Sequence, residues 1–278
     1  MSNLLARMCV RAGLRCHSQT PRRTPASFGL PYEEIRFRTA HRDGISLSGW
    51  LLPAANPRGL VILCHGYGSA RSFMLPKARM LQRNGYTALL FDFRARGLSE
   101  GRYCTLGQDE TEDVLGAIRF VRSREDLSSL PLALLGESMG GAAAILAAAR
   151  EASVQAVITE GAFASLDQAV LQRFRTFLGP WGTQIAQACI EISGQEYGVN
   201  IASVAPVAAI AQLAPRPLFM IIDGLDPVCP RSESERLYAA ASEPKQRWIV
   251  PGAFHSYAYQ IAQKAYERRV TAFLQDAM

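Results

Sequence analysis

A serine in the segment 136–140 (GESMG) could act as a nucleophile. The segment follows a short apolar run and precedes an alanine-rich stretch, which predicts a sharp turn between a strand and a helix. A serine hydroxyl is a weak nucleophile, and this turn would direct the oxygen of Ser138 toward a base. Gly136 and Gly140 are expected to leave room for the turn, because a Cβ there would crowd the neighbouring backbone. Glu137 is expected to point away from the hydroxyl and to have a structural role.

A general base for Ser138 must come from one of four histidines. His255 lies in a loop between the last apolar run and the last helical stretch, whereas His17 and His41 fall outside the active edge of the predicted sheet. Choosing His255 also gives the chain order serine, aspartate, histidine, which is typical of a nucleophile on this kind of turn. We therefore predict that His255 is the base.

The acid that orients the base should follow a strand between Ser138 and His255, and the segment IIDGLDP offers Asp223 and Asp226. Asp226 is predicted to lie in the loop beyond the strand, where its carboxylate can reach the far nitrogen of the histidine and fix the tautomer. Asp223, at the strand end, is expected to order the turn. We predict Asp226 as the acid and keep Asp223 as the alternative.

Two backbone N–H groups are expected to form an oxyanion hole, which stabilises the negative charge that develops in an acyl-transfer transition state. Met139 directly follows the serine and would supply one donor. The loop HGYGS after the apolar run 60–64 would supply the other from Tyr67, with His65 as a structural residue of that loop.

Short apolar runs alternate with helical stretches through most of the chain, which predicts an α/β fold with a mostly parallel sheet covered on both faces. Residues 34–39 and 46–52 are expected to form an antiparallel hairpin at the sheet edge. Six buried strands are predicted at 60–64, 86–92, 132–135, 156–159, 218–222 and 247–250, and helices at 72–84, 109–124, 139–150, 231–241 and 257–276. Residues 163–210 are longer than one crossover needs, so they predict a small helical cap insertion with helices at 166–178 and 181–192.

The chain has 278 residues, of which 49% are hydrophobic, and this is enough for one catalytic domain over residues 30–278. Residues 1–29 form a basic leader that holds much of the formal net charge of +6 and has no acid before Glu33. The leader could be a targeting segment, a helix that contacts a membrane surface peripherally, or a loosely docked extension. We find no nucleic-acid-binding module.

The six cysteines show neither paired metal-ligand spacing nor a disulfide framework, which indicates reduced thiols in a cytoplasmic protein without a metal. Cys64 is expected to be a small core residue. No apolar run is long enough for a transmembrane helix. The oligomeric state is left open.

The chain resembles the α/β-hydrolase superfamily, in particular its bacterial esterase, lysophospholipase and serine-aminopeptidase-like branch, over residues 30–276. The resemblance rests on the HG of the oxyanion loop, the segment FDFRARGLSEG at 91–101, the serine turn, Asp226 and His255. The chain departs from the common RGxG with Arg94-Ala95-Arg96-Gly97, and from the common HGxxD with a spacing one residue shorter before Asp226.

The resemblance implies an α/β-hydrolase fold with an eight-stranded sheet and hydrolysis of a carboxylic ester or thioester through an acyl-enzyme, without a cofactor. The partner would be a small-molecule acyl ester. A serine peptidase or an acyltransferase with the same triad, and a non-catalytic ligand-binding protein, remain alternatives, since a fold does not name a substrate. Four cap aromatics suggest either an apolar acyl site or simple packing: Phe163, Phe174, Phe177 and Trp181.

Overall fold

The computed structural model describes residues 2–15 and 23–278. In this part of the chain, eight strands form one sheet in the order β1-β2-β4-β3-β5-β6-β7-β8. β2 runs antiparallel to β1 and to β4, and the other neighbouring strands described are parallel. The strands are β1 Glu33–Arg38, β2 Ser46–Leu52, β3 Gly59–Cys64, β4 Tyr86–Phe91, β5 Leu132–Glu137, β6 Ala156–Glu160, β7 Leu218–Asp223 and β8 Lys245–Val250.

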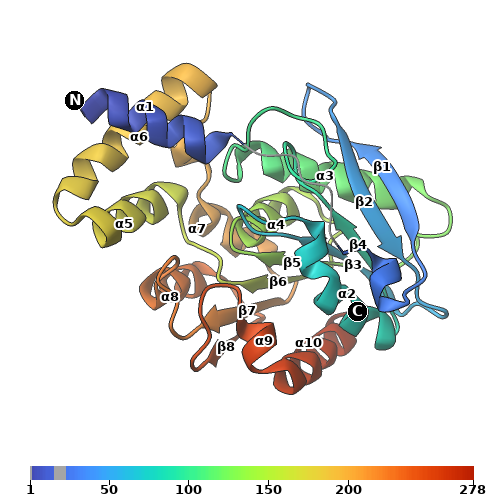
Figure 1. The fold of residues 1–278 in the computed structure, drawn as a ribbon. Coiled ribbons are helices and arrows are strands. Elements are labelled where there is room, and N and C mark those ends of the chain that lie inside the picture. The colour runs from blue at the N-terminus through green and yellow to red at the C-terminus, as the bar shows by residue number, and fades with distance from the viewer. Residues whose placement is uncertain (1, 16–22) are drawn as a thin grey trace.

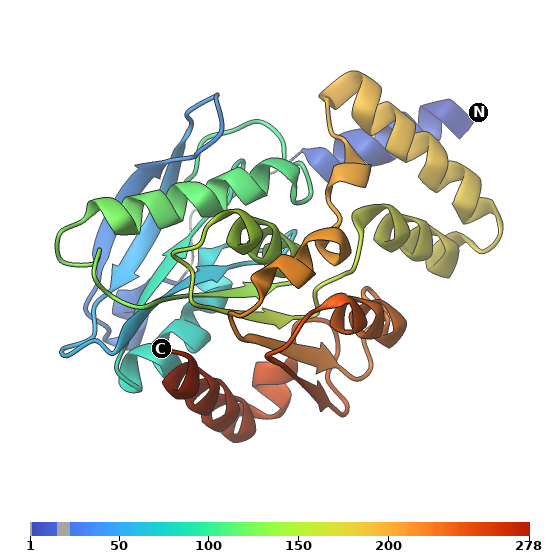
Figure 2. The ribbon, with the colours of Figure 1, turned by 180° about the vertical axis from the view of Figure 1, so that it is seen from behind.

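Helices cover both faces of the sheet, as predicted (Figures 1 and 2). α3 (Gln108–Ser123), α4 (Met139–Arg150) and α8 (Arg231–Ala240) pack on one face. α2 (Leu75–Arg83), α9 (Ala258–Ile261) and α10 (Gln263–Ala277) pack on the other. The side chains of β3 alternate between the two cores, because successive side chains of a strand point to opposite faces.

The predicted edge hairpin is confirmed, with Arg38 of β1 opposite Ser46 of β2. The predicted extents of two helices were wrong. The last helix is interrupted at Ala262, whose φ of −131° and ψ of 44° separate α9 from α10, although the sequence around it is continuously helical in pattern. The second helix of the insertion continues to Tyr197 and ends where Gly198 adopts the left-handed conformation with φ of 68°.

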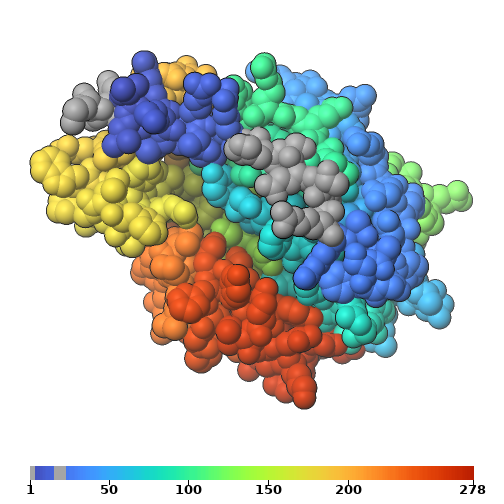
Figure 3. Space-filling model, viewed as in Figure 1, coloured from blue at the N-terminus to red at the C-terminus, as the bar shows by residue number. Residues whose placement is uncertain are grey.

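A group of short and long helices lies between β6 and β7, at one end of the molecule (Figure 1). It consists of α5 (Leu166–Leu178), α6 (Trp181–Tyr197), η3 (Ile201–Ser203), α7 (Pro206–Ala209) and η4 (Ile210–Leu213). Of the predicted leader, residues 2–14 form α1 (Ser2–Leu14), which packs across α6 and buries Ala6, Val10 and Leu14 in a third core. Figure 3 shows α1 in dark blue lying on these helices. The predicted domain limits, 1–29 and 30–278 with a cap at 163–210, stay predictions.

Residues 16–22 of the leader, with Cys16 and His17, lie outside the described residues. None of the helices in the described ranges is both long and apolar enough to cross a membrane. The five cysteines described are free thiols, and Cys64 is fully buried in the core, as expected.

Candidate active site

Ser138 lies at the turn between β5 and α4 with a φ of 51°, in the left-handed region that a serine rarely adopts. The flanking glycines make this turn possible. A Cβ on Gly136 would lie 2.4 Å from the carbonyl oxygen of Gly140, and a Cβ on Gly140 would lie 2.2 Å from that of Cys64. The Ser138 N–H donates to the Glu160 carbonyl at 2.8 Å, which ties the turn to the neighbouring strand β6.

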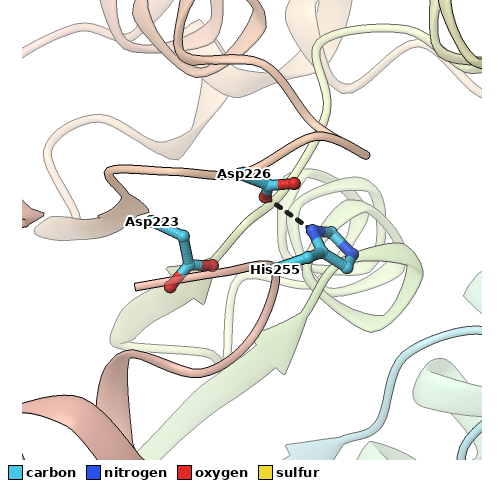
Figure 4. Close-up of side chains that lie close together, drawn as sticks. All are labelled: Asp223, Asp226 and His255. Atoms are coloured by element: carbon cyan, nitrogen blue, oxygen red, sulfur yellow. Dashed lines mark hydrogen bonds and ion pairs between the residues drawn. The ribbon is translucent and has the colours of Figure 1, made fainter. Parts of the chain in front are cut away.

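His255 connects Ser138 to Asp226. Its Nδ1 lies 2.6 Å from Asp226 Oδ2, and its Nε2 lies 2.8 Å from Ser138 Oγ (Figure 4 shows the first of these contacts). An ionised carboxylate can only accept, so Nδ1 carries the proton and Nε2 is left to accept from the serine hydroxyl. The structure therefore brings the three predicted residues together from three loops, in the tautomer that general-base chemistry requires.

The Asp226 carboxylate is held in place by its own turn. Its Oδ1 accepts the backbone N–H groups of Val228 at 2.7 Å and Cys229 at 2.8 Å, so both oxygens have partners. The Asp226 side chain is 1% exposed and that of His255 is 20% exposed. The Asp226 carboxylate is thus buried and fixed, while the imidazole of His255 is partly exposed.

Asp223 supports the loop that carries His255. Its Oδ2 accepts the N–H of Ser256 at 2.8 Å, and Ser256 has a φ of 59°, in the left-handed region. Burial and the nearby Glu160 carboxylate raise the pKa of Asp223 to about 7. In Figure 4 the Asp226 carboxylate faces the His255 ring and is joined to it by the dashed line, whereas no such line runs from Asp223 to the ring. Asp223 was predicted to order its own turn before Gly224, whereas the hydrogen bond found here goes to the loop of His255.

The predicted oxyanion loop lies against Ser138. A Cβ on Gly66 would be 3.4 Å from Ser138 Cβ. His65 is fully buried, its Nε2 accepts the Phe93 N–H at 3.1 Å, and its Nδ1 therefore donates to the Gly66 carbonyl at 2.8 Å. Met139 begins α4 on the other side of Ser138. The oxyanion roles of Tyr67 and Met139 stay predictions.

A buried ammonium group, which the sequence analysis missed, lies behind the nucleophile turn. Lys77 of α2 forms ion pairs with Glu137 and with Glu160, the latter at 2.5 Å, and these three side chains are almost fully buried. Although burial opposes it, the two carboxylates hold the pKa of Lys77 well above its usual value, while burial raises the pKa of Glu137. Glu160 Oε1 also accepts the Ala258 N–H at 3.0 Å, so the cluster joins the serine turn to the chain that follows His255.

Lys77→Met is expected to lower the free energy of unfolding by about 3–5 kcal/mol, because it leaves buried carboxylates without their cation. The loss should be larger at pH 8 than at pH 5. A carboxyl whose folded pKa is raised above its unfolded pKa destabilises the fold increasingly as pH rises. Urea denaturation at both pH values measures this, with the exposed Lys264→Met as matched control. Equal stability of Lys77→Met and Lys264→Met would contradict the prediction.

The segment in which the chain departs from RGxG keeps the backbone that a glycine would take. Ala95 has a φ of 55°, and its N–H donates to the Glu100 carbonyl at 2.8 Å. Gly97 packs against the Asp92 carboxylate, which a Cβ would overlap. Arg94 lies between Asp113, at 2.8 Å, and Asp109, at 3.0 Å. The chain therefore has an alanine where the common RGxG pattern has a glycine, and Ala95 adopts a strained backbone conformation with positive φ.

Among the described residues, Asp223, Asp226 and His255 are the one group whose ligand atoms lie close enough together to hold a metal ion. Most of these groups already hydrogen-bond: the imidazole nitrogens to Asp226 and Ser138, and Asp223 Oδ2 to the Ser256 N–H. Asp223 Oδ1 is buried and has no hydrogen-bond partner among the described residues. The expected absence of a metal and of a cofactor stays a prediction.

The four aromatic residues noted between β6 and β7 do not surround one site. Phe163 is buried in the third core, whereas Phe177 and Trp181 are 68% and 73% exposed at the turn between α5 and α6. The structure also has a cavity of about 140 Å³ whose lining includes Gln168, Arg175 and Glu233. Neither feature includes the Ser138 hydroxyl.

The sheet, its crossover helices and the serine turn after β5 define the class of the α/β-hydrolases. A model of the family described as serine aminopeptidase S33 matches residues 55–194, and the chain belongs to this family.

Its relatives include proteins from several bacteria. The chain is 30% identical to the uncharacterised protein YfhR of Escherichia coli strain K12 over 234 residues, covering 82% of this chain and 74% of that protein. It is 29% identical to the uncharacterised protein Rv2307c of Mycobacterium tuberculosis over 217 residues, covering 77% of this chain and 70% of that protein.

Solved structures confirm the α/β-hydrolase fold. The chain is similar to the Pyrococcus furiosus esterase Pf2001 with a TM-score of 0.79 and 23% identity, covering 95% of this chain and 98% of that chain. It is also similar to the α/β-hydrolase GrgF of Penicillium sp. sh18, with a TM-score of 0.70 and 23% identity, covering 90% and 99%.

Proposed function

We propose that the protein is a serine hydrolase that cleaves a carboxylic ester or thioester through an acyl-enzyme. One observation carries the proposal: the hydrogen bonds from Ser138 Oγ to His255 Nε2, at 2.8 Å, and from His255 Nδ1 to Asp226 Oδ2, at 2.6 Å. These contacts give the weakly nucleophilic serine hydroxyl a base whose Nε2 is unprotonated and able to accept its proton.

The reaction follows from this geometry. His255 Nε2 takes the proton of Ser138 Oγ as the oxygen attacks the substrate carbonyl, and Asp226 stabilises the imidazolium that forms. His255 then gives the proton to the leaving alcohol or thiol, which leaves Ser138 acylated. In the second half, His255 removes a proton from water as the water attacks the acyl group, and Ser138 recovers its proton when the acid leaves.

We assign the oxyanion hole to the backbone N–H groups of Met139 and Tyr67. Met139 is the first residue of α4, where unpaired N–H groups and the helix dipole favour negative charge. The closeness of Gly66 to Ser138, where an added Cβ would lie 3.4 Å from Ser138 Cβ, supports Tyr67 as the second donor. As the next residue, Tyr67 would border the substrate carbonyl that Ser138 attacks.

An ester is the favoured substrate, and the structurally similar Pyrococcus furiosus protein is described as an esterase. We expect turnover of p-nitrophenyl esters of short to medium acyl chains. Profiling these esters against aminoacyl p-nitroanilides with the same enzyme preparation measures the preference. Cleavage of the amides alone would contradict the ester assignment.

A peptidase that uses the same triad is the second candidate, because the description of the family is serine aminopeptidase S33. Amide cleavage needs the same nucleophile and base but a leaving group that must be protonated as it departs. The substrate profile above separates the two functions, and transfer of the acyl group to an added alcohol would indicate an acyltransferase.

We also propose that the helices at 163–210 form a cap beside the substrate and that α1 contacts an anionic membrane surface peripherally. The outer face of α1 exposes Leu4, Leu5 and Met8, with Arg7 and Arg11 beside them and no acid in the helix.

Sedimentation with vesicles tests the membrane contact. Binding is expected to vesicles of phosphatidylcholine with phosphatidylglycerol at low salt, and to decrease when Arg11 and Met8 are both changed to Ser, because charge and apolar area are both lost. Equal binding to pure phosphatidylcholine, or no binding to either, would contradict it.

A further inference from the structure

Helix α1 is joined to α6 at several points. Ala6 is fully buried, and its carbonyl accepts the Cys189 thiol at 3.7 Å. Arg7 pairs with Glu196 at 2.8 Å. Val10, 5% exposed, completes the contact in the third core. The N-terminal part of α1 is therefore fixed to the second helix of the proposed cap.

The other end of α1 is joined to the catalytic part of the molecule. The Leu14 carbonyl accepts the Cys104 N–H at 2.9 Å, and Arg15 forms a β-bridge with Tyr103. Tyr67 Oη donates to the Gly13 carbonyl at 2.6 Å. One helix thus spans from α6, which it crosses in Figure 1, to the loop that borders Ser138.

The loop that receives this contact is rich in glycine. Tyr67 lies between Gly66 and Gly68, and Gly68 has a φ of 75° with open space around the position of a Cβ. The Gly66 carbonyl belongs to the same planar peptide group as the Tyr67 N–H, and it accepts hydrogen bonds from His65 Nδ1 at 2.8 Å and from the Ser69 N–H at 3.2 Å. These bonds set the orientation of that peptide within the loop, and the Tyr67 side chain adds an anchor from outside the loop. The contacts of the Tyr67 side chain include the Gly13 carbonyl and the Arg96 guanidinium, which lies 5.0 Å from the ring centre.

We propose that α1 acts as a strap that positions the oxyanion loop: the hydrogen bond from Tyr67 Oη to the Gly13 carbonyl holds the loop, and with it the peptide that carries the Tyr67 N–H, in place beside Ser138. The proposal rests on the proposed function, and it makes Tyr67 a positioning residue through its side chain as well as a donor through its backbone. It also gives the N-terminal helix a part in catalysis, since displacing α1 from α6 would release the loop.

The test uses the full chain and two perturbations of the same contact. Tyr67→Phe removes only the hydroxyl, and Val10→Asp puts a charge into the interface between α1 and α6. Each variant is expected to lower kcat for a p-nitrophenyl ester about tenfold and to change KM less than about twofold. The reason is that a displaced Tyr67 N–H would stabilise the transition state less, while substrate binding is largely kept. The double variant should be no slower than the slower single variant, since both break one linkage.

Matched controls separate positioning from folding. Leu4→Asp places the same charge on the exposed face of α1, and Tyr238→Phe removes a hydroxyl remote from the site. Both should keep kcat within about twofold of the wild type. Thermal unfolding of every variant identifies loss of the fold.

Three results would overturn the proposal: a wild-type kcat for Tyr67→Phe, a lower melting temperature without a lower kcat, or multiplicative losses in the double variant. These results leave the proposed function intact when wild-type hydrolysis depends on Ser138. A wild type that hydrolyses no ester would overturn the proposed function and the strap together.

Discussion

Ser138→Ala is expected to lower kcat for p-nitrophenyl esters by at least about 10⁴-fold, because the covalent route is lost and only binding and the oxyanion donors remain. The fold should be retained, since alanine keeps the Ser138 N–H that donates to the Glu160 carbonyl. Steady-state hydrolysis, with a melting curve of the same preparation, measures both quantities.

The matched control for this variant is Ser129→Ala, an exposed serine in the loop after α3, which should hydrolyse at the wild-type rate. Ester hydrolysis that is unchanged by Ser138→Ala would contradict the nucleophile assignment. Inactivity of the wild type toward esters, thioesters and amides would instead favour the non-catalytic ligand-binding alternative.

Asp226→Asn is expected to lower kcat about 10⁴-fold, whereas Asp223→Asn should lower it less than about tenfold. An amide at residue 226 can donate to His255 Nδ1 and so favours the wrong tautomer, with Nε2 protonated and unable to accept from Ser138. An amide oxygen at residue 223 can still accept the Ser256 N–H, so the loop is kept.

The pH–rate profiles of the two variants sharpen this comparison. Residual activity of Asp226→Asn should increase at high pH, where hydroxide can replace the missing base. A larger kcat loss in Asp223→Asn than in Asp226→Asn would contradict the assignment and make Asp223 the acid.

The sequence predicted the strands and most helices closely because their apolar periodicity is strong and their ends carry turn residues. The predicted bounds of α4 and α5 agree with the structure. The break at Ala262 had no local signal, because alanine favours helix and only tertiary contacts decide against it.

The residues of the candidate site were accessible to sequence reasoning because each lies directly after a predicted strand, and the carboxyl ends of parallel strands meet at one edge. In the structure Asp226, and not Asp223, hydrogen-bonds to His255. The sequence had favoured Asp226 only because of its position in the loop beyond the strand.

Lys77 could not be found this way. It lies within an amphipathic helix, far in sequence from Glu137 and Glu160, and a lysine there is normally solvated. The docking of α1 could be given only as one of three alternatives, because a short basic helix without acids has the same pattern whether it packs on a protein or on a membrane.

The most direct test of the account is the site of modification by a fluorophosphonate, which reacts with a serine hydroxyl activated by a neighbouring base. Peptide mass spectrometry of the labelled full chain should locate one adduct on Ser138, lost in Ser138→Ala and strongly slowed in His255→Ala. An adduct on another residue, or equal labelling of the wild type and Ser138→Ala, would contradict the central claim that His255 activates Ser138.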